Sequence, residues 1–266
     1  MVCIYKNGLD FINDNQDILH NDPINLAFYV IDARIINSFD KNGFILKCYD
    51  ENRYLLVLYL HPMNLMLYGD CSLCNEVCLV LNKYGFDFNG VLAESNLGEC
   101  FLLEYERLFG GRHKVHLSMS IMKCNYVDYC DCSDVEFSKD KDLFEIYGLF
   151  KMFHKEALGD DVDEESFKSK FNCRNYCLIR KNDRIVSIAK RRDVDNISSI
   201  SFVYTLPLFR GFGFAKRIVS KLTMDILNEG KLPYLYVDNN NLISNHLYKS
   251  IGYDYDNPQT EFYYFK

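Results

Sequence analysis

VYTLPLFRGFGFAKRIV, residues Val203 to Val219, is a stretch whose pattern changes twice. A β-type run ends at Pro207, two glycines one residue apart follow, and apolar residues then recur at helical spacing. Glycines between a strand and a helix carry no Cβ, so they let a ligand approach the backbone closely. The first turn of a helix offers free N–H groups and the positive end of the helix dipole, which favour an anion. We therefore predict a phosphate-binding turn at this point.

Three phosphate-binding patterns fit this turn to different degrees. A dinucleotide fingerprint needs a third glycine where the chain has Lys216, and a P-loop needs Gly-Lys-Ser/Thr, which the turn lacks. The pattern that remains is Arg-x-x-Gly-x-Ala, formed by Arg210, Gly213 and Ala215. Arg210 also adds a positive charge next to the glycines in the sequence.

Composition places the chain among globular proteins and argues against several classes of partner. Of its 266 residues, 48% are apolar and 25% are charged, which suffices for a hydrophobic core. A net charge of -7 without a basic block argues against nucleic acid as a partner. No apolar run approaches the roughly 20 residues of a membrane span, and the N-terminus lacks signal-peptide features. With 11 scattered cysteines, the chain is expected to keep reduced thiols in the cytoplasm.

Cys71, Cys74 and Cys78 raise the alternative of a metal site. Their spacing is that of one helix face, apolar residues surround them, and no fourth ligand follows at a suitable spacing. We expect these thiols, and those of Cys130 and Cys132, to be small buried hydrophobic groups, and we expect no metal.

The polar, acidic segment at 128–142 separates two halves, so we predict one domain over residues 1–128 and a second over 129–266. In the second half, the patterns predict two helices, a hairpin that turns at Asn182 and Asp183, and a helix over 214–229. A strand, a short helix that ends at Gly252 and a closing strand complete it. The order of elements indicates a mixed α/β (α+β) fold around one sheet.

The first half has a similar alternation of helical and strand-like patterns, but it lacks the glycines of the phosphate-binding turn. Helical patterns at about 73–84 and 100–111 alternate with strand-like segments, among them 90–94 and 114–124. We interpret the first half as the product of a degenerate internal duplication.

The glycine turn and its surroundings resemble the GNAT superfamily of N-acetyltransferases. The superfamily signature is Arg/Gln-x-x-Gly-x-Gly/Ala, here preceded by the strand SFVYTLP. The later stretch YLYVDNNNLISNHLYKSIGY matches Val-Asp-x-x-Asn-x-x-Ser-x-x-Leu-Tyr-x-x-x-Gly-Phe/Tyr. The resemblance covers about 143–266 and implies the GNAT fold, a mostly antiparallel central sheet flanked by helices, with a second related N-terminal domain. It also implies that the turn binds the pyrophosphate of acetyl-coenzyme A.

The resemblance assigns roles to residues at matching positions. The backbone groups expected to meet the pantetheine arm and the acetyl carbonyl are those of Val203, Tyr204 and Thr205. The pyrophosphate would lie on the turn formed by Arg210, Gly211, Phe212, Gly213, Phe214 and Ala215. Asn241 and Ser244 would lie near the pantetheine, and Tyr248 would be the general acid. Without the resemblance, Asn241 and Ser244 would be read as loop or cap residues and Tyr248 as a packed tyrosine.

The general base remains open. Many superfamily members carry a carboxylate on the strand before the phosphate turn, whereas this chain has ISSISF at 197–202. His154, Glu261 and His246 are candidates by position only. Water could also deprotonate the amine, or the substrate could bring an amine of low pKa.

These observations favour an N-acetyltransferase with acetyl-CoA as cosubstrate, in which an amine attacks the thioester directly. The expected acceptor is a small-molecule or peptide amine, and the net charge mildly favours a cationic one. The first domain would be a degenerate acetyltransferase-like half that shapes the acceptor pocket, as in two-domain bacterial relatives. The alternatives are a catalytically inactive CoA-binding regulatory protein and a purely structural domain. The sequence leaves the oligomeric state open.

Overall fold

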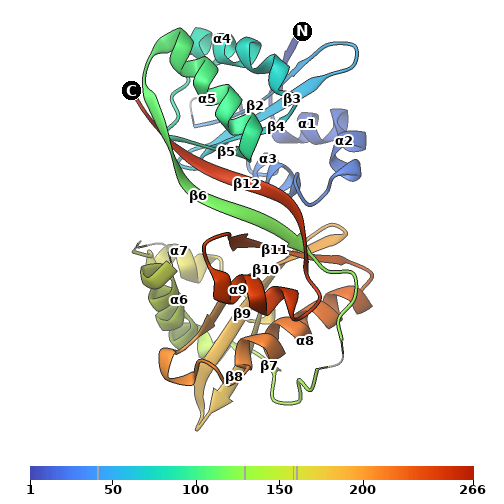
Figure 1. Ribbon diagram of the computed structural model, residues 1–266, viewed down its shortest axis with the longest axis vertical. Helices are drawn as coiled ribbons and strands as arrows, with labels where there is room; N and C mark the ends of the chain where they lie inside the picture. Colours follow the sequence, from blue (N-terminus) through green and yellow to red (C-terminus); the bar gives the residue numbers. More distant parts are fainter. Residues whose placement is uncertain (41, 129, 158, 160) are drawn as a thin grey trace. The chain divides into compact units, whose positions relative to one another are not determined.

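We describe a computed structural model that covers residues 1–40, 42–128, 130–157, 159 and 161–266 (Figure 1). The chain forms two compact units that alternate along the sequence. The first unit comprises Met1–Ile121, Val237–Asn241 and Asp256–Lys266, and the second comprises Met122–Tyr236 and Leu242–Tyr255. Strands and helices pack together in each unit, and most strand pairs are antiparallel. The expected mixed α/β class with a mostly antiparallel sheet is confirmed.

The first unit places helices on a mainly antiparallel sheet of strand order β1-β2-β3-β4-β5-β12-β6. The strands are β1 (Val2–Ile4), β2 (Gly43–Tyr49), β3 (Tyr54–Leu60), β4 (Leu65–Gly69), β5 (Gly90–Glu94), β6 (Arg112–Lys123) and β12 (Asp254–Phe265). The helices are α1 (Gly8–Asp14), α2 (Gln16–Asn21), α3 (Ala27–Ala33), α4 (Cys74–Tyr84) and α5 (Ser95–Phe109). The helices expected near 73–84 and 100–111 and the strands expected at 90–94 and 114–124 are therefore confirmed.

The thiols of α4 pack largely as expected. Cys74 and Cys78 are buried in the hydrophobic core of the first unit, together with Val77 and Leu81 of the same helix. Cys71 is exposed, however, so the expectation of burial is wrong for this residue, which lies in the 3-10 turn before α4. Within the described ranges, no three His, Cys, Asp or Glu side chains are grouped as a metal ion would require.

The closing strand β12 corrects the predicted domain division. It pairs antiparallel with β5, with Phe262 opposite Val91, and the Phe262 side chain is 2% exposed in the core of the first unit. Gly98 of α5 allows this packing, because a Cβ there would lie 2.5 Å from the Phe262 ring. The residues expected to form one continuous domain at 129–266 are thus shared between the two units, because strand periodicity does not say which sheet a strand joins. Residue 129 itself lies outside the described residues.

The second unit has the strand order β11-β10-β9-β8-β7. The strands are β7 (Glu136–Phe137), β8 (Tyr176–Lys181), β9 (Arg184–Val194), β10 (Ile197–Thr205) and β11 (Leu232–Asp238). The helices are α6 (Leu143–Ala157), α7 (Glu164–Ser169), α8 (Phe214–Asn228) and α9 (Leu242–Lys249). The predicted hairpin is confirmed, because Asn182 and Asp183 join β8 to β9 with φ of 51° and 62°, as a tight hairpin turn requires.

The two faces of this sheet carry different helices. Tyr176 and Leu178 of β8 belong to a hydrophobic core with α6 and α7. Arg191 of β9 instead bonds Glu229 at the end of α8, and α8 packs along β8, β9 and β10 (Figure 1). Because neighbouring residues of a strand point to opposite faces, α8 covers one face and α6 with α7 the other. Across the described ranges, no helix is long and apolar enough to cross a membrane.

A network of ion pairs and hydrogen bonds surrounds Asp193 at the end of β9. Arg191 and Lys231 both donate to the Asp193 carboxylate, and the Ser198 hydroxyl donates to it at 2.7 Å. Burial opposes ionisation of Asp193, but these hydrogen bonds outweigh it, so the pKa of Asp193 lies well below its usual range. The charged form is therefore the one that stabilises the fold.

We predict that Asp193→Asn lowers the free energy of unfolding at pH 7 by about 1 kcal/mol. The value is modest because the carboxylate is 42% exposed, so water screens its ion pairs. A depressed native pKa gives stability that is present above the unfolded pKa of about 3.9 and is lost as pH falls through the native pKa. Urea unfolding followed by circular dichroism should show the difference at pH 7 and a smaller one at pH 3. An equal difference at both values would contradict the assignment.

Candidate functional site

A β-bulge interrupts β10 just before the predicted site. Ser201 pairs with Lys190 of β9 and Tyr204 pairs with Ile188, so two residues of β10 oppose one of β9. Phe202, in the bulge, has φ of 50°, a left-handed conformation that is strained for a bulky residue. Its side chain is 5% exposed and packs against the rings of Phe150 and Phe153 of α6, with centroids 5.0 and 5.3 Å away. This packing holds the backbone in its strained form.

The bulge lies where β10 and β11 part. Their parallel pairing runs over Ile197–Ser199 and Leu232–Tyr234, at the start of both strands. Val203 is the second residue of the bulge, and Tyr204 and Thr205 follow it; in the described residues none of the three has a ladder partner in β11. The strand edge that faces β11 is therefore available to another extended chain or ligand.

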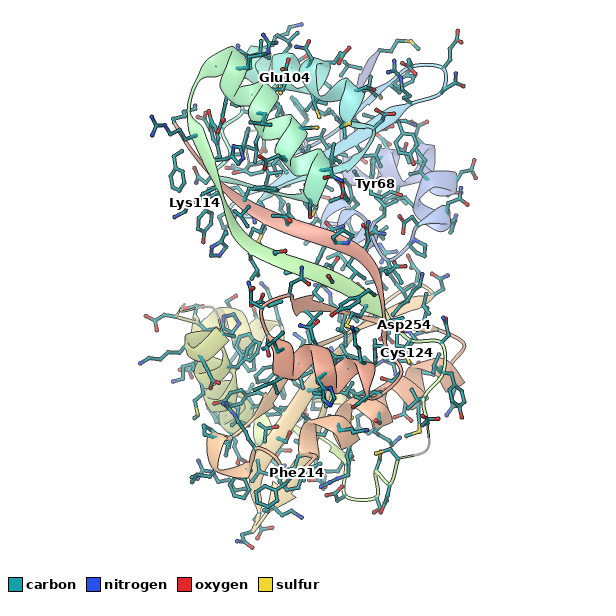
Figure 2. The ribbon with its side chains drawn as sticks, in the orientation of Figure 1. Tyr68, Glu104, Lys114, Cys124, Phe214 and Asp254 are labelled. Atoms are coloured by element: carbon teal, nitrogen blue, oxygen red, sulfur yellow. The ribbon has the colours of Figure 1, made fainter. Side chains whose placement is uncertain are left out.

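The glycine turn follows a 3-10 turn at Pro207–Phe209 and leads into α8. Gly211 and Gly213 have φ of 83° and 76°, conformations that a side chain disfavours. Gly213 is the N-cap of α8 and no side chain caps the helix start, so the N–H groups of the first turn point outward without a side-chain acceptor. Figure 2 shows Phe214 at this end of α8. The predicted turn and helix start are thus present, with Phe212 exposed and Ala215 in the first helical turn.

The side chain of Arg210 lies along β10. Its Nε donates to the Thr205 carbonyl at 3.0 Å, its guanidinium bonds the Glu156 carboxylate at 2.8 Å, and it lies 5.6 Å from the centroid of the Tyr204 ring. The hydrogen bond from Arg210 lowers the pKa of Glu156, so this pair is charged at neutral pH. Arg210 therefore links α6 to the strand, and Glu156 compensates its charge.

Arg217 is a second cation at the turn, which the sequence pattern did not single out. It donates to the Phe212 carbonyl at 3.2 Å and forms a two-pronged ion pair with Asp134, at 3.0 and 3.1 Å. Its guanidinium also lies 4.9 Å from the centroid of the Phe214 ring. The only sequence signal was its position four residues after Gly213, which places it one helical turn further along. Asp134 belongs to the acidic segment that was interpreted as a domain boundary, so part of that segment supports the turn.

The residues expected to surround the pantetheine lie at the start of α9. Asn241 is exposed, and its N–H donates to the Asp238 carbonyl at 3.0 Å in the turn that ends β11. Ser244 is half-buried in the first turn of α9. Asn241 falls in the first unit and Ser244 in the second, so their placement around one ligand stays a prediction.

Tyr248 is a buried phenol in the last turn of α9. Its side chain is 7% exposed, and its ring packs against Tyr253 with centroids 6.1 Å apart. Burial raises the pKa of Tyr248 to about 12, so the hydroxyl is protonated at neutral pH. Within the described part of the chain, the hydroxyl has no hydrogen-bond partner, whereas the Tyr253 hydroxyl bonds Thr223. Such a proton is free to be donated to a ligand.

The three candidate bases differ in their surroundings. His154 packs against Phe150 with tilted rings and centroids 4.3 Å apart, and His246 is exposed on α9. Glu261 accepts from Asn64 at 2.7 Å within the first unit. Glu156, which the sequence analysis did not consider, lies 3.4 Å from the Tyr204 hydroxyl. None of these contacts distinguishes one of them as the base.

Comparison with known proteins shows which family model and which solved structures the chain resembles. Residues 177–263, which include the glycine turn and α9, match the family model described as FR47-like protein. A GNAT-family acetyltransferase from Colwellia psychrerythraea superposes with a TM-score of 0.65 at 12% identity, over 100% of both chains. A GCN5-related N-acetyltransferase from Sphaerobacter thermophilus gives 0.60 at 14% identity, over 88% of this chain and 84% of that one. No curated protein matches the sequence.

At identities this low, the superpositions establish the fold alone. The family match covers residues 177–263, which include the glycine turn and α9. The chain therefore has the fold of GNAT acetyltransferases.

We predict that Gly213→Ala lowers the free energy of unfolding by about 1 kcal/mol. The cost is conformational, because a left-handed residue with a Cβ is strained while the nearest atom to that Cβ is 3.6 Å away. Gly148→Ala in α6 is the matched control, because Gly148 lies in open space inside a helix, where alanine is the better helix former. Chemical unfolding should therefore give shifts of opposite sign, and equal shifts would contradict the role of φ at Gly213.

Proposed function

We propose that the chain is an N-acetyltransferase that uses acetyl-CoA as cosubstrate. The observation that carries the proposal is the coincidence of three features in the second unit: a bulged β10 that parts from β11, two left-handed glycines, and a helix without a side-chain cap. Together they provide an open strand edge for the pantetheine amides and converging N–H groups for the pyrophosphate. The family match over the same residues supports this choice of ligand.

Different residues of β10 and the glycine turn would bind different parts of acetyl-CoA. The N–H groups from Gly211 to Ala215 would bind the pyrophosphate, with the helix dipole adding positive potential and Arg217 holding the Phe212 carbonyl in place. The backbone of Val203, Tyr204 and Thr205 would bind the pantetheine arm and orient the thioester. Arg210, bonded to Thr205 and Glu156, would fix the strand end relative to the turn.

In the proposed reaction, the amine nitrogen attacks the thioester carbonyl, and the C–S bond then breaks. The amine loses one proton and the departing thiolate gains one, so a base and an acid are needed. Tyr248 would supply the proton to the sulfur. A phenol that burial keeps protonated can donate to a thiolate, whose thiol has a pKa of about 8.5.

The other parts of the proposal concern partners and the first unit. The acceptor would be a small-molecule or peptide amine, in the cytoplasm, without nucleic acid or membrane as partner and without a metal. The first unit would be a degenerate acetyltransferase-like half, since its sequence has no Arg-x-x-Gly-x-Gly/Ala turn. A CoA-binding protein without turnover is the second candidate, favoured by the missing carboxylate on β10. Thiol release with a panel of amines separates the two.

We expect acetyl-CoA to stabilise the protein, by about 2.7 kcal/mol at a hundredfold excess over its dissociation constant. Gly213→Glu should abolish this shift, because it places a side chain and a negative charge at the site of the pyrophosphate. The measurement is thermal unfolding with and without acetyl-CoA.

Two variants control for strain at this position. Gly85→Glu introduces the same side chain at another left-handed glycine, with φ of 65° and open space, at the end of α4. Both Gly85→Glu and Gly213→Ala should keep the acetyl-CoA shift. A full shift in Gly213→Glu would overturn the assignment of the phosphate turn.

We expect Tyr248→Phe to reduce turnover by roughly a hundredfold and to leave acetyl-CoA binding nearly intact. General acids contribute about 10²- to 10⁴-fold, and a thiolate already leaves readily, so the lower end applies. The substitution keeps the ring that packs against Tyr253 and removes a hydroxyl without a hydrogen bond to any described residue. Steady-state kinetics and calorimetry on one preparation separate catalysis from binding. Unchanged turnover in Tyr248→Phe would mean that Tyr248 is not the general acid and that its role is packing.

A further inference from the structure

Two cations of β9 lie on one face of the sheet, next to the bulge. Lys190 pairs with Tyr176 of β8 and with Ser201 of β10, the last residue before the bulge. Arg192, two residues further along β9, pairs with Ser199. Paired residues of neighbouring strands point to the same face, and so do residues two apart on one strand. These side chains therefore share a face.

This face is the one that α6 and α7 cover. Tyr176 is 1% exposed and belongs to the core that these helices form with the sheet, and the Lys190 Nζ lies 5.5 Å from the centroid of its ring. Arg191, between the two cations, points the other way and bonds Glu229 at the end of α8. Lys170, just after α7, adds a third positive charge close enough to act on Lys190.

No described carboxylate pairs with Lys190, Arg192 or Lys170. The acids on the surrounding elements bond other cations. Glu145 of α6 bonds Arg180 and Glu156 bonds Arg210, whereas Glu164 and Glu165 of α7 bond Lys168. Burial lowers the pKa of Lys190, and the charges of Arg192 and Lys170 lower it further. A half-buried cation that is surrounded by like charges is costly unless an anion joins it.

The cations lie close to the proposed site of acetyl transfer. Ser201 leads directly through the bulge into Val203, and neighbouring strands lie about 4.8 Å apart. On the other side of β10, Ser199 pairs with Tyr234 of β11, at the point where the two strands part. A ligand on this face can therefore contact Lys190 at one end and reach the open strand edge at the other.

We propose that Lys190, with Arg192 and Lys170, binds the carboxylate of the acceptor, so that the substrate is a small amino acid rather than a simple cationic amine. This inference rests on the proposed function and extends that function by naming the substrate class. The cluster sets the local potential at the acceptor face, which outweighs the long-range effect of the net charge of -7.

The first experiment compares acids with their amides as acceptors. The probes are glycine, β-alanine and 4-aminobutyrate, which vary the distance between amine and carboxylate, each alongside its carboxamide. We expect at least one acid to exceed its amide tenfold or more in kcat/KM. Lys190→Gln should raise KM for that acid by roughly 10- to 100-fold and leave the amide unchanged, because a charged hydrogen bond is lost.

Matched variants separate charge from folding. Lys190→Arg keeps the charge and should retain the preference, and Lys83→Gln removes an exposed lysine of α4 and should change nothing. Arg192→Gln alters an exposed residue and should weaken the preference in the same direction even if Lys190→Gln fails to fold. A preference for acids that survives both Lys190→Gln and Arg192→Gln would overturn the assignment.

A binding measurement makes the two proposals separable. Calorimetry with the N-acetyl derivatives of the same three acids needs no turnover. If no amine is acetylated but Lys190→Gln weakens binding of one derivative at least tenfold, the carboxylate site stands and the proposed transferase activity fails. If amides are acetylated as well as acids and no derivative loses affinity in Lys190→Gln, the activity stands and the carboxylate site is overturned.

Discussion

The strained backbone of Phe202 is the constraint on which the site depends. Its positive φ is held by two phenylalanines of α6, and the bulge that it forms has two consequences. It occurs where β10 leaves β11, which opens a strand edge in the middle of a sheet. It also shifts the register with β9 directly after the Ser201–Lys190 pair, so that Tyr204 lies opposite Ile188. Packing on one face of β10 thereby fixes a free backbone edge and a line of side chains next to it.

The glycine turn was predictable from sequence, whereas the bulge was not. Glycine tolerates φ near 80° without strain, so the presence of Gly211 and Gly213 in the sequence predicts the turn. Phe202 reads as an ordinary strand residue, and its conformation is imposed by Phe150 and Phe153, about fifty residues earlier. The order of strands and helices was likewise predictable, but the sheet that β12 joins was not. Its alternating pattern fits either sheet, and the choice depends on how Phe262 meets Gly98.

Charge placement could not be predicted because it depends on pairing through space. The sequence assigned the positive charge at the turn to Arg210, yet that side chain bonds Glu156 and the strand. Arg217 holds the Phe212 carbonyl instead, and Asp134 from a segment that resembles a linker fixes its position. Both arginines have carboxylate partners, so neither presents an uncompensated charge. The converging N–H groups of α8 are thus the main fixed attraction for a phosphate at this turn.

The contrast with Lys190 shows why unpaired charges are informative. Each arginine at the turn has a carboxylate within 3.1 Å, as does Arg191 on the opposite face of the sheet, so folding itself explains their positions. Lys190 lies over the Tyr176 ring, which attracts its ammonium group weakly, but two like charges act on it and no described carboxylate pairs with it. Glutamine or methionine would fill the same space at lower electrostatic cost. A lysine there lowers the stability of the isolated fold, and an anionic ligand restores what it costs.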